Sequence, residues 1–285
     1  MRNRFRTIWL LLTLVSPLAA QQTSLSTQPD YAAAMMREHG HEMPSATPAA
    51  RTAPRREVSG EMVVYGTVDG KMIHGYMARP GGSVARGGPA IIVVHEWWGL
   101  NENIKAVADR YAGEGYTVLA VDLFGRVATT PDTAMVLYQT AMKNIPSGET
   151  NLAAAISYLK SQGTGKIGVV GYCFGGHWSL RTGLVGGPDI KAVVMYYGAP
   201  ITDPVQLSRL SSPVLGLYGG LDTGIPIDSV RAMERSMKAA GRSVSITVYA
   251  DAKHAFANAS GQAYNPAAAS DAWAKSLAFF KTNLH

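Results

Sequence analysis

The sequence predicts an α/β protein in which helices cover both faces of a mostly parallel sheet. From Val58 to the C-terminus, short apolar runs alternate with longer amphipathic stretches, and this alternation is typical of a doubly wound sheet. One run, Ile91–Val94, is apolar at every position. Both sides of that strand are therefore expected to face a hydrophobic layer, as in a parallel sheet between helices.

The expected elements follow one another in a regular order. The first two strands, Met62–Val64 and Lys71–Met77, flank Val68-Asp69-Gly70 and predict an antiparallel hairpin at one edge of the sheet. Six later strands are expected at 90–94, 117–121, 166–170, 190–196, 214–218 and 243–249. Helices are expected at 102–114, 133–143, 149–161, 175–184, 227–240 and 267–283. We therefore expect one folded domain over residues 58–285.

The first 20 residues have the pattern of a secretory signal peptide. Three arginines precede the apolar run Ile8–Val15, and small residues follow up to Ala20. The apolar run is too short to span a bilayer. We expect cleavage after Ala20, export to a periplasm or beyond the cell, and no membrane span after signal removal. A short N-terminal membrane anchor is the alternative.

Residues 21–57 are rich in proline and alanine, which predicts a flexible arm. The only helical pattern in the arm is Tyr31–Glu38. His39 and His41 follow it, but two histidines without a third ligand nearby are a weak indication of a metal site. We therefore expect both to be solvated.

Composition excludes several classes of protein. Hydrophobic residues make up 47% of the 285 and charged residues 16%, so the chain can form a large core and is not of the disordered type. The net charge is +6, and removing the three leader arginines leaves 23 basic against 20 acidic residues. This balance, without a basic cluster, does not indicate a nucleic-acid partner. A single cysteine excludes an intrachain disulfide and a multi-cysteine zinc site.

That cysteine lies at a predicted turn from strand to helix. Gly171-Tyr172-Cys173-Phe174-Gly175-Gly176 places glycines on both sides of Cys173. A nucleophile elbow has this G-x-S-x-G pattern, here with a thiol in place of the serine hydroxyl. The N-terminus of the following helix favours negative charge on the sulfur. The alternative is a small apolar cysteine that fills a glycine-rich turn.

Two later strand ends carry the partners that such a nucleophile needs. Asp222 follows the strand at 214–218, and His254 follows the strand at 243–249. The order nucleophile, acid, histidine is the order of this type of triad. His254 is the expected general base, and Asp222 is expected to fix its tautomer. Asp251 and Asp228 are alternative carboxylates, although neither follows a strand end in the same way.

The loop after the first buried strand, His95–Asn101, predicts an oxyanion hole. The backbone N–H of Trp97 is the expected donor from this loop, and the N–H of Phe174 is the second. Glu96 is unusual there, because a carboxylate beside an oxyanion hole repels the intermediate unless it has a separate partner. We expect His95 to have a packing or hydrogen-bonding role rather than a catalytic one.

Five segments together resemble the dienelactone hydrolase family of α/β-hydrolases. The resemblance covers nearly all of residues 60–283. It rests on Val94–Asn101, Val121–Arg126, Gly171–Gly176, Tyr218–Asp222 and His254–Phe256.

The resemblance implies a Cys173–Asp222–His254 triad and an ester or lactone substrate. It also implies that Glu96 helps to generate the thiolate once substrate binds, so the resting thiol is less exposed to oxidation. Of the two arginines that anchor a substrate carboxylate in the family, Arg126 matches one, and Asn258 stands where the other is found.

We therefore expect an exported hydrolase that cleaves a small ester or lactone by acyl transfer, with no metal or cofactor. Trp98 is a further candidate for the substrate pocket. A general carboxylesterase or thioesterase is the first alternative, and a non-catalytic binding protein on the same scaffold is the second. The sequence does not indicate an oligomeric state.

Overall fold

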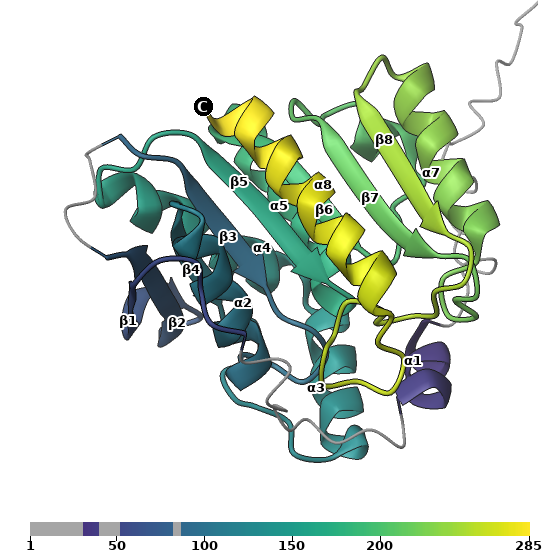
Figure 1. Cartoon of the computed structure of the whole chain (residues 1–285), viewed down its shortest axis with the longest axis horizontal. Helices are drawn as coiled ribbons and strands as arrows, with labels where there is room; N and C mark the ends of the chain where they lie inside the picture. Colours follow the sequence, from purple (N-terminus) through teal and green to yellow (C-terminus); the bar gives the residue numbers. More distant parts are fainter. Residues whose placement is uncertain (1–30, 40–51, 82–86) are drawn as a thin grey trace, which may run out of the picture. The chain divides into compact units, whose positions relative to one another are not determined.

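A computed structural model describes residues 31–39, 52–81 and 87–285 of the chain (Figure 1). The predicted leader and His41 lie outside these residues. The described sheet has eight strands in the order β1-β2-β4-β3-β5-β6-β7-β8. They are β1 (Val58–Val68), β2 (Lys71–Pro80), β3 (Ala90–Val94), β4 (Thr117–Val121), β5 (Ile167–Tyr172), β6 (Ile190–Tyr196), β7 (Val214–Gly219) and β8 (Val244–Tyr249).

Strand pairing confirms the predicted mixed sheet. β1 pairs with β2, and β2 with β4, in antiparallel fashion, whereas the strands from β4 to β8 are parallel. The hairpin between β1 and β2 is closed by Asp69 and Gly70, which have φ values of 50° and 75°. Two positive φ values in a two-residue loop match the twist of the strands that it joins.

Helices lie on both faces of the sheet, as predicted. In Figure 1, α8 (Pro266–Leu284) crosses in front of the sheet, whereas α4 (Ile145–Ser161) and α5 (Phe174–Gly186) lie behind it. α2 (Glu102–Gly113) contacts α8 through Arg110 and Trp273. The remaining helices are α1 (Tyr31–His39), α3 (Pro131–Lys143), α6 (Pro204–Leu207), α7 (Ile227–Ala239) and the 3₁₀ turn η3 (Gly187–Asp189).

Of the four helices that begin earlier than predicted, α3, α4 and α8 have a proline in the first turn. Pro131, Pro146 and Pro266 occupy the first or second positions of α3, α4 and α8. Proline is tolerated there because the first N–H groups of a helix have no partner within it. Among the helices of the described residues, none is long and apolar enough to cross a membrane.

Candidate active site

The turn between β5 and α5 holds Cys173 in a strained conformation. Cys173 has a φ of 56° and caps the N-terminus of α5. A Cβ atom at Gly171 would lie 1.8 Å from the Gly175 carbonyl oxygen, and one at Gly175 would lie 2.2 Å from the Val94 carbonyl oxygen. Only glycine fits at either position, so the two glycines let the turn close against the end of β3. The predicted elbow geometry is therefore present.

Asp222 and His254 meet at the carboxyl ends of β7 and β8. His254 Nδ1 lies 2.7 Å from Asp222 Oδ2, and both side chains are buried. The other oxygen, Oδ1, accepts the N–H groups of Gly224 and Ile225, each at 2.8 Å. The carboxylate is thus fixed on both oxygens. Asp251 and Asp228, the alternative partners, are both exposed.

The electrostatic environment of His254 favours its protonated form. Burial alone lowers the pKa of His254, but the charges of Asp222 and of a Cys173 thiolate raise it more, so that the pKa lies well above its ordinary value. A ring nitrogen of His254 lies within 4.8 Å of the Cys173 sulfur. The raised pKa makes His254 a strong proton acceptor beside the Cys173 sulfur.

The loop after β3 is organised by hydrogen bonds of His95 and Glu96. His95 Nε2 accepts the Leu123 N–H at 3.1 Å, and its Nδ1 lies 2.6 Å from the Glu96 carbonyl oxygen. Because Nε2 accepts, Nδ1 carries the proton. Burial lowers the pKa of His95. His95 is thus a neutral, hydrogen-bonded packing residue that stacks on Phe174, and its predicted structural role is confirmed.

Each oxygen of the Glu96 carboxylate has a hydrogen-bond partner of its own. Its Oε2 accepts a hydrogen bond from the Asn258 amide at 2.8 Å, and its Oε1 accepts a longer one from the Tyr197 hydroxyl at 3.4 Å. Glu96 is 5% exposed. Asn258 uses its amide to hold Glu96 and also lines the cavity next to it, and its predicted role in substrate binding stays a prediction.

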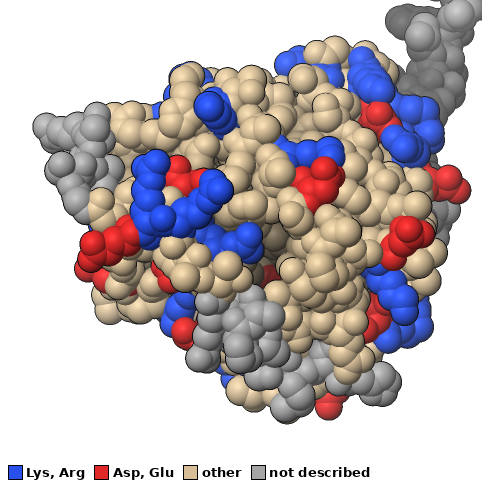
Figure 2. Space-filling model, viewed as in Figure 1, with Lys and Arg blue, Asp and Glu red and all other residues tan. Residues whose placement is uncertain are grey.

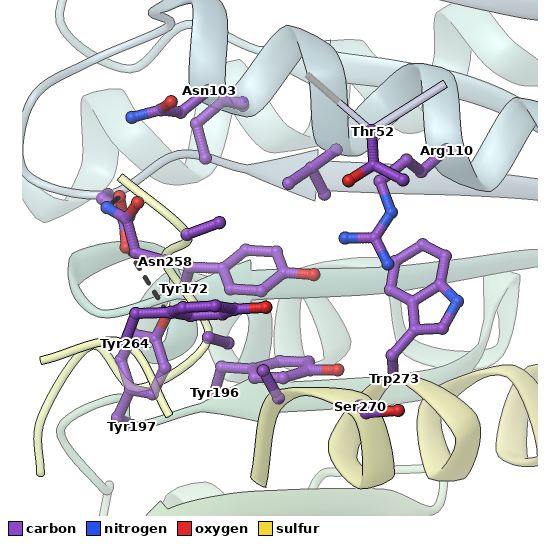
Figure 3. A pocket seen from close by; sticks show the side chains of 16 residues that line it. Thr52, Asn103, Arg110, Tyr172, Tyr196, Tyr197, Asn258, Tyr264, Ser270 and Trp273 are labelled. Atoms are coloured by element: carbon purple, nitrogen blue, oxygen red, sulfur yellow. Dashed lines mark hydrogen bonds between the residues drawn. The ribbon is translucent and has the colours of Figure 1, made fainter. Parts of the chain in front are cut away.

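A cavity of about 250 Å³ extends from Glu96 between α2 and α8. At its far end the Arg110 guanidinium stacks on Trp273 at 4.0 Å, and the hydroxyls of Tyr172 and Tyr196 point toward the same end (Figure 3). The described residues form no ion pair with Arg110. Among the lining residues, Arg110 is therefore the cation that the cavity offers to a ligand.

The cavity opens on a face of mixed charge. Figure 2 shows a hollow near the centre of that face, with basic and acidic side chains interspersed around it. The surface around the hollow therefore carries no field of a single sign.

The other predicted substrate residues lie elsewhere. Arg126 is exposed, and Trp98 is buried against Trp97 at a ring distance of 4.8 Å. Neither lines this cavity, and their predicted substrate roles stay predictions. Phe174 is the first residue of α5, and Trp97 lies in the loop after β3. The start of α5 and the end of β3 are in close contact at Gly175, where the oxyanion hole is predicted.

Two residues of the site were missed by the sequence analysis. Arg110 is an ordinary basic residue of an amphipathic helix, and nothing in its local pattern marks it as a cavity residue. His39 was expected to be solvated, and this expectation is wrong: His39 is 3% exposed and its ring lies 5.1 Å from that of His254. The reason is that α1 packs onto the domain near α3.

Comparison with known proteins agrees with this geometry. Residues 73–284 match the model of the dienelactone hydrolase family. The protein belongs to the dienelactone hydrolase family. A protein of Methylorubrum extorquens named "Putative carboxymethylenebutenolidase" is 34% identical over 231 residues, which cover 74% of this chain and 77% of that one. The predicted family resemblance is confirmed.

Solved structures place the fold in the same family. A Klebsiella pneumoniae protein described as "Putative Dienelactone Hydrolase" has a TM-score of 0.69 and 28% identity, covering 79% of this chain and 99% of that one. A dienelactone hydrolase-like promiscuous phosphotriesterase from metagenomic libraries has a TM-score of 0.73 at 21% identity, with coverages of 80% and 99%. The second similarity concerns the fold alone. Family membership makes the protein a hydrolase of ester bonds.

Proposed function

We propose that this dienelactone hydrolase family member cleaves a carboxylic ester or lactone through a Cys173–His254–Asp222 triad. The observation that carries the proposal is the buried Asp222–His254 pair, joined at 2.7 Å, beside a cysteine held at a strand-to-helix elbow. The three side chains come from the ends of three parallel strands. This combination gives the nucleophile a base and gives the base an orienting acid.

The reaction is acyl transfer in two steps. His254 accepts the thiol proton as the Cys173 sulfur attacks the carbonyl carbon, and the oxyanion binds to the N–H groups of Trp97 and Phe174. The carbonyl re-forms as the C–O bond to the leaving group breaks, and His254 gives its proton to the leaving alkoxide. His254 then takes a proton from water, whose oxygen attacks the thioester, and returns it to the departing sulfur.

The proposal is tested with the Cys173→Ala variant. Wild type and variant are compared on a dienelactone and on a small neutral aryl ester. We expect turnover of at least one substrate and its loss in the variant. Residual turnover at the wild-type rate would refute the cysteine mechanism. Cysteine-dependent cleavage of the aryl ester alone would keep the triad and assign the protein to general carboxylesterases.

We also propose that Glu96 assists His254 in generating the Cys173 thiolate once substrate binds. Its carboxylate is buried, held by Asn258, and lies beside the catalytic loop. Glu96→Gln is expected to lower turnover and to change the pH dependence of Cys173 alkylation. Cys173 is the only cysteine, so alkylation reports on that thiol alone. Unchanged turnover and an unchanged alkylation profile would remove Glu96 from the mechanism.

We also assign the recognition of an anionic group on the substrate to Arg110. The guanidinium lies at the far end of the cavity from Glu96, close to the Tyr172 and Tyr196 hydroxyls (Figure 3). A guanidinium beside the Tyr172 hydroxyl suits a carboxylate, whereas the Tyr196 hydroxyl donates to Ser276 Oγ, which itself donates to the Ala272 carbonyl oxygen. Cys173 is not among the residues that line this cavity, so the substrate would reach from Arg110 past Glu96 to place its ester at Cys173.

Export is part of the same proposal. It rests on the leader pattern of residues 1–20. N-terminal sequencing of protein from the secreted or periplasmic fraction is expected to begin at Gln21. A chain that keeps Met1 and stays with the membrane fraction would instead support an N-terminal anchor.

A further inference from the structure

The N-terminal arm brings a second histidine to the catalytic cysteine. His39, the last residue of α1, is buried with its ring 5.6 Å from the Trp97 ring and 5.1 Å from the His254 ring. The preceding residue, Glu38, accepts a hydrogen bond from the Thr223 hydroxyl. Because Thr223 directly follows Asp222, α1 is tied to the loop that carries the triad carboxylate.

His39, Cys173 and His254 have the geometry of a metal site. One ring nitrogen from each histidine and the cysteine sulfur all lie within 4.8 Å of one another. Three such atoms share a centre that is at most about 2.8 Å from each (4.8 Å divided by √3), and zinc binds sulfur at about 2.3 Å and imidazole nitrogen at about 2.0–2.1 Å. Side-chain shifts of roughly 0.5–0.8 Å would therefore complete the coordination.

The surroundings of the three ligands also suit a bound cation. Asp222 binds Nδ1 of His254, so the other ring nitrogen is the one that can act as a ligand. A carboxylate behind a ligating histidine is the usual support of such a ligand. The rings of Trp97 and Tyr197 pack against the two histidines and hold them in place.

We propose that His39, Cys173 and His254 bind Zn²⁺, and that the bound metal holds α1 against the site and blocks the nucleophile. The blocking role rests on the proposed function, since it requires Cys173 and His254 to be catalytic. A thiolate and two imidazoles suit Zn²⁺ among the biological divalent cations. Binding releases the thiol proton to solvent, the sulfur and both nitrogens each donate a lone pair, and water fills the fourth position. No electron is transferred.

The site is tested directly by metal binding. Co²⁺ added to the full-length protein is expected to give a thiolate-to-cobalt charge-transfer band that Zn²⁺ abolishes. Zn²⁺ affinity is measured by competition with a chromogenic chelator for wild type, His39→Ala and His39→Asn. Loss of a ligand is expected to weaken binding by at least about 10-fold. The control is His74→Ala, an exposed histidine on β2, which is expected to keep wild-type affinity.

Inhibition is measured separately from binding. Hydrolysis with Zn²⁺ is expressed relative to each variant's own rate with chelator, and the inhibition constant is expected to rise at least about 10-fold in His39→Ala. Equal Zn²⁺ affinity or equal inhibition in wild type and both His39 variants would overturn the proposal, as would the absence of a cobalt band in wild type.

The experiments distinguish failure of the proposed function from failure of the metal site. A His39-dependent cobalt band in a protein without Cys173-dependent hydrolysis would refute the proposed function and the blocking role, but would keep the metal site. Cys173-dependent hydrolysis with no His39-dependent metal binding would refute the metal site alone.

Discussion

At the scale of single residues, Asp222 is distinguished from its neighbours by the bonds on both of its oxygens. One oxygen binds the imidazole of His254, and the other accepts two backbone N–H groups. Such a carboxylate holds one tautomer of the histidine, and this tautomer leaves the nitrogen facing the thiol free to accept a proton.

The first prediction concerns this tautomer. Asp222→Asn is expected to lower kcat by about 10³–10⁴-fold, since an amide can donate to Nδ1 and reverse the tautomer. The matched control is Asp251→Asn, which changes an exposed aspartate three residues before His254 and is expected to leave kcat within about twofold. Steady-state kinetics on the same ester measure both. Similar losses in the two variants would contradict the role of Asp222.

A second prediction at this scale separates two arginines. Arg110→Gln is expected to raise KM for a carboxylate-bearing ester by about 10-fold or more, because a hydrogen bond to a charged group contributes about 1.5–3 kcal/mol. The KM for a neutral ester is expected to stay the same. Arg126→Gln, at an exposed position, is the comparison. A larger effect there would move anion recognition to the position that the family resemblance implies.

At the scale of elements, the turn between β5 and α5 depends on close backbone contact. Gly171→Ala forces a Cβ to within 1.8 Å of the Gly175 carbonyl oxygen, so the turn must open. We expect a loss of about 3 kcal/mol in the free energy of unfolding, together with loss of activity.

The matched control for this turn is Gly70→Ala. Gly70 has a positive φ but open space around it, so only the backbone conformation costs energy, about 1–2 kcal/mol. Urea denaturation of both variants compares the two effects. An equal loss in both would mean that the elbow tolerates a side chain at position 171.

At the scale of the whole molecule, a buried histidine couples stability to pH. His177 on α5 lies 3.0 Å from the Ala199 carbonyl oxygen through Nδ1, and its Nε2 accepts from Arg181 at 2.9 Å. Arg181 in turn pairs with Glu149 on α4. Burial and the Arg181 charge lower the pKa of His177 to about 4. The native protein therefore keeps this imidazole neutral.

The lowered pKa of His177 makes the native protein less stable in acid. Between pH of about 6.5 and 4, the unfolded chain binds a proton at His177 and the native protein does not, so stability is present above this range and is lost as pH falls. The loss is on the order of 3 kcal/mol. Denaturation at several pH values is expected to show a shallower decline for His177→Gln than for wild type. Equal slopes would contradict the prediction.

The sequence by itself determined those features that depend on neighbours along the chain. Alternating apolar runs defined the strands and helices, Asp69-Gly70 marked the hairpin turn, and the glycines around Cys173 marked the elbow. The two turns depend on backbone sterics at one or two residues. The strands and helices depend on which face of a short segment is buried. The chain order of Cys173, Asp222 and His254 was also readable, because parallel strands bring their carboxyl ends to one edge.

The tertiary structure alone decided which distant side chains meet. Glu96 and Asn258 are 162 residues apart, Arg110 reaches the cavity only because α2 packs beside α8, and His39 reaches His254 because α1 docks on the domain. Local periodicity shows that a helix has a buried face, but the order of the strands and the packing of the helices determine what that face contacts. The partners of a buried charge or imidazole are therefore set by the assembled fold.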